Sequence, residues 1–232
     1  LPLPDGGPRL LQHAAARPDG ELWLATSAGL FRRLGDAWEK VAVVDRLGRD
    51  WTAGAVLAVT WDSAGRPWVA TAAGVSRRDT DGWTCFDGAA GLPWNEFTAA
   101  AAGPRGEVWF ATRRGLIRWD DRGFHYRQGP RWLPADDVRQ LVVDADGTAW
   151  AATESGLGCI ARRPMTLQEK AEHYEAEIER HIARTPFGFV ATARLGTPGD
   201  RDTAAAEDTD NDGLWTAMYG AGECFAYAAT SS

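Results

Sequence analysis

The sequence has few of the residues and patterns that mark metal sites, membrane spans or hydrolase centres. Its three cysteines, Cys85, Cys159 and Cys224, lie far apart with no Cys-x-x-Cys spacing, so neither a zinc site nor a dithiol redox motif is indicated. No apolar run approaches the roughly 18 residues of a membrane helix. No Ser-His-Asp arrangement, nucleotide-binding loop or His-x-x-x-His pair is recognisable.

Positive charge is also scarce. The 232 residues include 25 Lys and Arg against 32 Asp and Glu, which gives a formal net charge of −7. A nucleic-acid surface needs clustered basic residues to neutralise phosphates, and here they are scattered along the chain. We therefore expect no nucleic-acid partner. With 44% hydrophobic and 25% charged residues, the composition is that of an ordinary globular protein.

Tryptophan, by contrast, is abundant, with 12 residues. Part of this excess belongs to a repeat, Gly-x-x-Trp-x-Ala-Thr-x-x-Gly, that occurs four times. Its tryptophans are separated by 45, 41 and 41 residues and are Trp23, Trp68, Trp109 and Trp150. Self-similarity at such a period indicates a structural unit that is repeated along the chain.

Each copy has the pattern of four short antiparallel strands. A polar turn ending in Gly precedes the alternating Trp-x-Ala-Thr strand, and a second Gly opens a third strand. Fifteen residues after the first three repeat tryptophans, Trp38, Trp83 and Phe124 indicate a fourth strand. Four strands in about 41 residues make one propeller blade. We predict an all-β propeller of four recognisable four-stranded blades over residues 1–162, with the repeat tryptophans in its core.

The repeat resembles the two-component-regulator propeller repeat of bacteria, which occurs in periplasmic ligand-binding sensor domains and in stand-alone extracytoplasmic proteins. The resemblance covers roughly residues 3–160. It implies a periplasmic or extracellular location and a sensor or ligand-binding role in signal transduction. Such propellers commonly have about seven blades, so we expect these four to be part of a larger ring.

A ligand site is expected where loops gather at one end of the propeller. The loops that lead into each blade and those between its second and third strands share an end in propellers generally, and they are more polar and variable than the repeat core. They could stack against and hydrogen-bond a sugar or an anionic oligosaccharide. Alternatively, they are solvated loops whose tryptophans cover the blade edges. The candidate ligand-binding residues are Trp94, Asn95, Glu96, Arg113, Arg114, Trp132, Asp136 and Asp137, with Arg131 and Glu154 in the same loops.

The character of the sequence changes near Pro164, and residues 163–232 are predicted to be mostly helical. Thr166-x-x-Glu169 is a capping-box pattern that opens a helix running to about Arg184. A strand over Phe189–Leu195 and a loop over Gly196–Ala206 are expected to follow. A second helix is predicted from about Trp215 to Ala229.

This tail looks like the truncated start of an α/α-toroid domain, a kind of domain that follows such propellers in some bacterial proteins and is suspected of acting on polysaccharides. The resemblance rests on the segments that begin at Arg184 and Asp210. The two histidines of the first predicted helix, His173 and His181, are eight residues apart with no third ligand nearby, which gives no metal-site geometry.

An acidic segment in the tail leaves three interpretations open. Asp208, Asp210 and Asp212, followed by Gly213, match the first half of an EF-hand-like calcium loop. The twelfth position is Tyr219 rather than the Glu that such a loop requires. The segment is therefore a weak Ca²⁺ site, an acidic N-terminal cap for the next helix, or a substrate or catalytic cluster.

Taken together, the sequence predicts an extracytoplasmic ligand-binding or sensor-type propeller that recognises a carbohydrate or similar polar ligand. The alternative is the N-terminal fragment of a polysaccharide lyase or glycosidase with the propeller as scaffold, or a scaffold for protein contacts alone. No catalytic residue can be named, so we favour a non-enzymatic role for this chain. The expected cofactor is none, or Ca²⁺. The expected partners are a carbohydrate and a downstream helical or signalling domain of the same protein.

Overall fold

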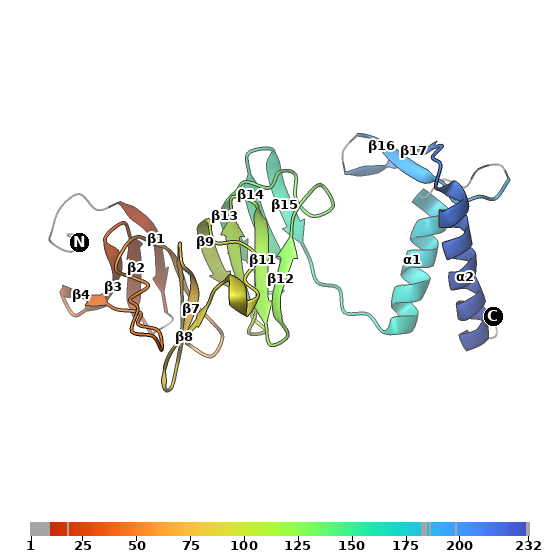
Figure 1. Ribbon diagram of the computed structural model, residues 1–232. Helices are drawn as coiled ribbons and strands as arrows, with labels where there is room; N and C mark the ends of the chain where they lie inside the picture. Colours follow the sequence, from red (N-terminus) through yellow and green to blue (C-terminus); the bar gives the residue numbers. More distant parts are fainter. Residues whose placement is uncertain (1–9, 18, 182–184, 186, 198, 231–232) are drawn as a thin grey trace. The chain divides into compact units, whose positions relative to one another are not determined.

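A computed structural model describes residues 10–17, 19–181, 185, 187–197 and 199–230. The chain divides into two compact units, Leu1–Arg162 and Arg163–Ser232. The first unit holds all four copies of the repeat as four antiparallel sheets, which follow one another in chain order (Figure 1). The β-propeller class expected from the repeat is confirmed.

Within each blade the strands pair in sequence order. Blade 1 consists of β1 (Leu11–Ala16), β2 (Leu22–Thr26), β3 (Gly29–Leu34) and β4 (Ala37–Val41). Blade 2 consists of β5 (Val56–Trp61), β6 (Pro67–Thr71), β7 (Gly74–Asp79) and β8 (Gly82–Phe86). Blade 3 consists of β9 (Phe97–Ala102), β10 (Val108–Thr112), β11 (Gly115–Asp120) and β12 (Gly123–Arg127), and a short 3₁₀ helix, η1 (Gly88–Ala90), precedes it. Blade 4 consists of β13 (Val138–Val143), β14 (Ala149–Thr153) and β15 (Gly156–Ile160), with no fourth strand among the described residues.

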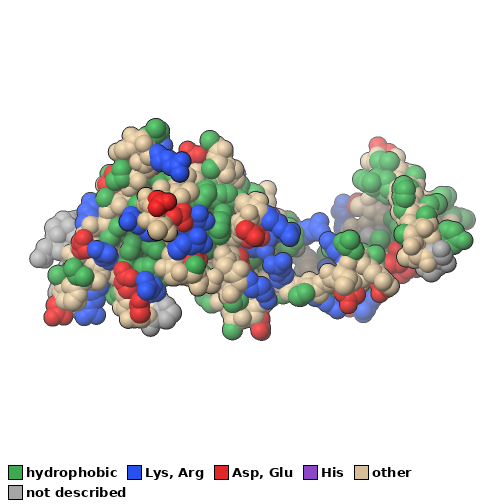
Figure 2. All heavy atoms as spheres, turned by 90° about the horizontal axis from the view of Figure 1, so that it is seen from below, with side chains coloured by type: hydrophobic (Ala, Val, Ile, Leu, Met, Phe, Trp, Pro, Cys, Tyr) green, Lys and Arg blue, Asp and Glu red, His purple; other side chains and the backbone are tan. Residues whose placement is uncertain are grey.

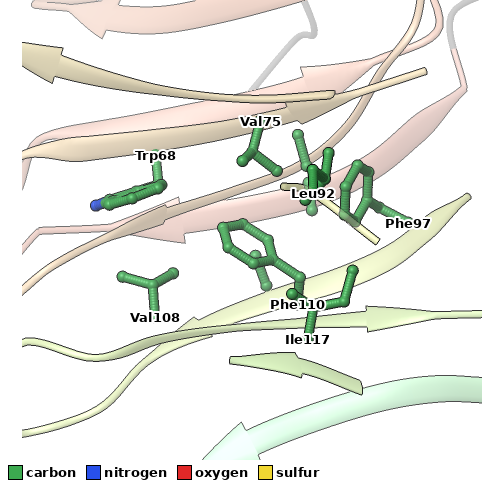
Figure 3. Close-up of a cluster of buried hydrophobic side chains, with 10 residues drawn as sticks. Trp68, Val75, Leu92, Phe97, Val108, Phe110 and Ile117 are labelled. Atoms are coloured by element: carbon green, nitrogen blue, oxygen red, sulfur yellow. The ribbon is translucent and has the colours of Figure 1, made fainter. Parts of the chain in front are cut away.

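The core lies between neighbouring blades. The innermost strands β1, β5, β9 and β13 contact one another in that order. Between blades 2 and 3, Trp68 and Val75 pack against Phe97, Phe110 and Ile117 (Figure 3). The Trp68 ring lies 6.0 Å from the Phe110 ring in a tilted arrangement. Each interface therefore pairs the repeat tryptophan of one blade with the inner strands of the next.

Three of the four repeat tryptophans are buried, as predicted, whereas the prediction is wrong for Trp150. Trp23, Trp68 and Trp109 are 5%, 0% and 4% exposed, whereas Trp150 is 39% exposed. Trp150 occupies the face of blade 4 that points away from blade 3, and Val142 is also exposed there. The difference has a simple cause, because no further blade covers this face among the described residues.

In blades 2 and 4, an aspartate fixes the turn between the first two strands. In blade 2, the Asp62 carboxylate accepts hydrogen bonds from the amides of Ala64 and Arg66 and from the Arg66 side chain. Its other role is to accept the Trp68 indole N–H at 3.0 Å. In blade 4 the Asp144 carboxylate accepts the Trp150 indole N–H at 2.9 Å. The hydrogen bond between the aspartate and the tryptophan thus connects the hairpin turn to the repeat tryptophan of the same blade.

The longer spacing between the first two repeat tryptophans comes from one additional turn of the same kind. It lies between blades 1 and 2 and is closed by the β-bridge of Val44 with Asp50. Burial raises the pKa of the Asp45 carboxyl, but hydrogen bonds from the Arg49 amide and side chain and from the Trp51 indole outweigh this and lower the pKa to about 2.

The second unit contains α1 (Leu167–His181), β16 (Thr192–Thr197), β17 (Asp200–Glu207) and α2 (Asp212–Thr230). The predicted capping box is present, because the Thr166 amide donates to Glu169 Oε2 at 2.7 Å and the Glu169 amide to Thr166 Oγ1 at 3.1 Å. The end predicted for this helix, Arg184, lies outside the described residues.

The loop predicted over Gly196–Ala206 is wrong, since β16 and β17 form a hairpin through this segment. Gly199 at a φ of 81° supplies the turn. The Arg194 side chain donates to both carboxylate oxygens of Glu207 on the opposite strand. The predicted second helix is correct, but it begins three residues earlier, at Asp212. Exposed hydrophobic side chains are frequent on α2 (Figure 2).

Replacing Trp109 or Trp150 with Ala tests the stacking of the blades at two equivalent repeat positions. Replacing the buried Trp109 should lower the free energy of unfolding by about 3–5 kcal/mol. Replacing Trp150, which has more than a third of its surface in water, should lower it by about 1–2 kcal/mol. Urea unfolding followed by circular dichroism measures both values, and equal losses would contradict the assigned interfaces.

His13 on β1 gives the fold a pH dependence in a defined window. Burial lowers the pKa of its imidazole from 6.5, and a hydrogen bond with the Val59 backbone offsets part of this shift. Its Nδ1 is buried with no partner among the described residues. The unfolded chain therefore binds the proton more readily than the folded one, and stability should fall as the pH drops below about 6.5.

The His13→Leu variant should lose part of that slope. We expect the difference in melting temperature between pH 7.5 and pH 5.0 to be smaller in the variant than in the parent, as measured by differential scanning calorimetry. A slope that is unchanged by the substitution would show that His13 does not titrate with folding.

Candidate functional site

A cavity of about 610 Å³ lies at the end of the propeller unit where the inner strands begin. Its volume is within the range of small-molecule sites, roughly 300–1,000 Å³. All four blades contribute to its wall. The lining residues are Gln12, Leu57, Ala72, Asn95, Glu96, Phe97, Thr98, Arg113, Asp137 and Arg139.

The wall is built by a feature common to the four blades. Each inner strand has a β-bulge one residue after its start, where its pairing with the second strand of the blade shifts by one. A bulge leaves one residue out of the ladder and redirects its side chain. The four bulge residues, Gln12, Leu57, Thr98 and Arg139, all line the cavity. We name it the bulge cavity.

Charged side chains from blades 3 and 4 form a network along one part of the bulge cavity. Arg113 Nη1 lies 3.4 Å from Asp137 Oδ1, and Arg139 Nε lies 3.9 Å from Asp137 Oδ2. Arg139 Nη2 also lies 3.4 Å from Glu154 Oε2. The Arg113 and Arg139 side chains are 62% and 59% exposed, so both guanidinium groups are open to a ligand while held by acidic partners.

Four of the eight predicted ligand-binding residues line the bulge cavity. Asn95, Glu96 and Asp137 come from the loops that lead into blades 3 and 4, and Arg113 comes from the turn between β10 and β11. The Asn95 side-chain amide donates to the Ala72 carbonyl at 2.6 Å, which ties the loop before blade 3 to a turn of blade 2.

The two predicted tryptophans lie outside the lining, and arginines cover their rings. The Arg114 guanidinium lies 5.0 Å from the Trp94 ring centroid, and the Trp94 indole donates to Glu96 Oε2 at 3.1 Å. Arg127 lies 4.7 Å from the Trp132 ring centroid. Both indoles also pack against interblade clusters. Cation–π contacts of this kind stabilise the loops and occupy ring faces on which a sugar could otherwise stack.

Asp136 has a backbone-organising role in the structure. Its carboxylate accepts the Gly129 amide at 2.6 Å, and its carbonyl accepts the Gly115 amide at 2.7 Å. These bonds hold the connection between blades 3 and 4 against the β10–β11 turn. Asp136 therefore shapes the site from outside the cavity lining.

Sequence reasoning missed the bulge residues. Each lies eleven residues before a repeat tryptophan, at a position where the four copies have Gln, Leu, Thr and Arg. The signal that could have identified them is this variation in side-chain chemistry at a fixed position of the repeat. The bulge itself was hidden, because an inserted residue reverses the alternation on which strand predictions depend.

A larger cavity of about 930 Å³ lies at the other end of the inner strands. Small residues such as Ala15 and Ala101 make up much of its wall. Two of its acidic residues, Asp62 and Asp144, already hold the indoles of Trp68 and Trp150. It contains none of the predicted site residues.

The acidic segment of the second unit lies at the start of α2. The Asp212 carboxylate accepts hydrogen bonds from the Thr209 amide at 3.1 Å and hydroxyl at 2.8 Å. The Asn211 side-chain amide donates to Asp210 Oδ1. Across the described part of the chain, no group of three or more His, Cys, Asp and Glu side chains is arranged to hold a metal ion. Asp208, Asp210 and Asp212 thus lie at a helix N-terminus, where negative charge is favourable.

Within the described residues, neither helix has both the length and the apolar character that a bilayer span requires. Acidic and basic side chains are interspersed over the propeller surface seen in Figure 2, without a continuous basic area. This distribution agrees with the scattered charges of the sequence.

The fold has counterparts among solved structures. The extracellular domain of the putative hybrid two-component system BT3049 from B. thetaiotaomicron is similar, with a TM-score of 0.51 and 24% identity over 64% of this chain and 21% of that one. The extracellular domain of BT4673 from the same organism has a TM-score of 0.53 and 16% identity over 67% of this chain and 25% of that one.

The chain spans about a fifth to a quarter of the length of these two extracellular domains. No protein-family description matches the sequence, and no curated protein is significantly similar to it. At this level of identity the likeness concerns the fold. The propeller unit is structurally similar to the extracellular propeller domains of two-component systems.

Proposed function

We propose that this chain is an extracytoplasmic ligand-binding or sensor-type propeller module, and that it binds a carbohydrate or similarly polar ligand in the bulge cavity. The observation that carries the proposal is the convergence of the four bulge residues on one cavity. A bulge at the same place in every blade directs one side chain per blade toward the same space, while the interblade core is left intact.

The chemistry of the wall suits a ligand with many hydroxyl groups. Arg113 and Arg139 offer several N–H donors, and Asp137 offers carboxylate acceptors. Leu57 adds apolar surface against which the C–H face of a sugar ring can pack. Ligand sites commonly combine an apolar wall with a few convergent polar groups.

The structural relatives support the location. Both are described as extracellular domains of two-component systems, and we extend that location, together with a role in reporting ligand binding to a downstream domain, to this protein. No contact among the described residues favours the alternative of a polysaccharide-degrading fragment.

A glycan-array screen followed by isothermal titration calorimetry tests this function. At least one glycan should bind, and the Arg113→Met variant should weaken its binding by about ten-fold or more, as expected when a charged hydrogen-bonding group is lost. The control is Arg122→Met, because Arg122 is an exposed arginine in the β11–β12 turn, outside the cavity lining.

Circular dichroism should show that both variants keep the parent's melting temperature within a few degrees. The proposal fails if no glycan binds. It also fails if a bound glycan is affected equally by the Arg113 and Arg122 substitutions, since binding would then lie elsewhere.

A further inference from the structure

The charges around the bulge cavity cancel. Its lining contains two carboxylates, Glu96 and Asp137, and two guanidinium groups, Arg113 and Arg139. In the adjoining turns, the acid Glu154 pairs with Arg139, and the basic Arg114, which covers Trp94, balances it. The formal charge of the lining is zero, and opposite charges alternate from Arg113 through Asp137 and Arg139 to Glu154.

Asp137 is the centre of this alternation. It lies within 3.4 Å of one guanidinium and 3.9 Å of another, and its side chain is only 28% exposed. A partly buried carboxylate that loses its cationic partner carries an uncompensated charge, which is unfavourable, although the exposure of both arginines reduces the effect. The network therefore favours ligands that leave neither Asp137 nor the two arginines without a partner.

We propose that the bulge cavity selects uncharged, hydroxyl-bearing sugars and discriminates against sugars that carry a carboxylate. This inference rests on the proposed carbohydrate-binding function and specifies its ligand class. A hydroxyl group donates to a carboxylate and accepts from a guanidinium at once. It inserts between Arg113 and Asp137 without leaving either of them unpaired.

A carboxylate-bearing sugar meets a different situation. When it pairs with Arg113 or Arg139, it places a second negative charge beside Asp137, which already lies 3.4 and 3.9 Å from these two guanidinium groups. Like charges brought together in a partly desolvated site act against the wrong ligand. The same arrangement that binds a neutral sugar thus rejects an acidic one.

The four bulge residues contribute to this preference for uncharged sugars. Among the four bulge residues, Arg139 alone is charged, and its two acidic partners come from the same blade. Gln12 and Thr98 contribute uncharged polar groups, and Leu57 contributes an apolar one. Apart from Arg139, none of the four bulge residues carries a positive charge that could compensate the carboxylate of an acidic ligand.

The test uses matched probes that differ only in the oxidation of C6. Galactotriose, glucotriose and mannotriose are compared by titration calorimetry with the corresponding triuronates at 20 mM and 300 mM NaCl. For at least one pair, the neutral member should bind about ten-fold more tightly or better, and its Kd should change less than about two-fold with salt, because no net charge is neutralised.

Removing one negative charge should change the selectivity. The Asp137→Asn variant leaves the lining with one guanidinium group in excess, so the matching triuronate should bind the variant about five- to ten-fold more tightly than it binds the parent, in a salt-dependent way. The neutral probe should weaken. The Arg122→Met variant serves again as the control and should leave the ratio of the two affinities unchanged.

The outcomes separate the two claims. If a triuronate binds the parent more tightly than its neutral counterpart and Arg113→Met abolishes that binding, the carbohydrate site stands and the selectivity for neutral sugars is overturned. The selectivity is also overturned if Asp137→Asn leaves the affinity ratio unchanged. If none of the six probes binds the parent, the neutral-sugar assignment falls, and the array screen decides the carbohydrate function separately.

Discussion

The hydrogen bond between an indole N–H and a carboxylate connects the local turns of this protein to its long-range packing. A repeat tryptophan is large enough to fill the space between two blades, but its N–H needs an acceptor once it is buried. In blade 2 the acceptor is Asp62, whose carboxylate also organises the hairpin turn that precedes the tryptophan. One side chain thus fixes the turn, the rotamer of Trp68 and the distance between blades.

The acid occupies different positions in alternate blades. Blades 2 and 4 have Asp62 and Asp144 six residues before the tryptophan. Blade 1 instead has Glu21, two residues before Trp23, and its Oε1 accepts the indole N–H at 2.9 Å. A longer side chain from a nearer position reaches the same nitrogen, so the physical requirement is kept while the sequence changes.

Blade 3 shows how the two solutions exclude each other. It has Glu107 at the nearer position and Gly103 at the farther one, and any Cβ at Gly103 would collide with the Glu107 side chain. Glu107 binds the Arg105 amide, and the Trp109 indole nitrogen has no partner among the described residues. The indole–carboxylate bond of the other three blades is therefore absent from the described part of blade 3.

Much of the propeller could be predicted because its repeat is dictated by packing. Glycines such as Gly74 and Gly115 adopt positive φ and leave no room for a Cβ against the next strand's backbone. Such positions recur in every copy and can be read from one sequence. Strand β17 was missed for the opposite reason, since its sequence is rich in Asp and Ala and has no Val, Ile or aromatic residue of the kind that usually marks a strand.

The site could be predicted only in part, because recognition depends on what the repeat leaves free. Loop polarity identified Asn95 and Arg113, whereas the inward direction of Arg139 depends on a bulge that alternation cannot show. The tryptophans of the loops, Trp94 and Trp132, attracted a ligand-stacking interpretation, yet arginines cover their rings. Abundance of an aromatic residue type does not tell which ring faces are available.

The bulges resolve a conflict that every repeat protein with a ligand site must meet. Residues that pack between blades cannot vary without loss of stability, while residues that meet a ligand must be free to vary. A bulge releases one residue per inner strand from the ladder, so Gln12, Leu57, Thr98 and Arg139 can differ while the flanking Val56 and Ala58 stay buried. Because the released residues of all four blades converge on one cavity, the chemistry of its wall can change at these four positions while the interblade core stays the same.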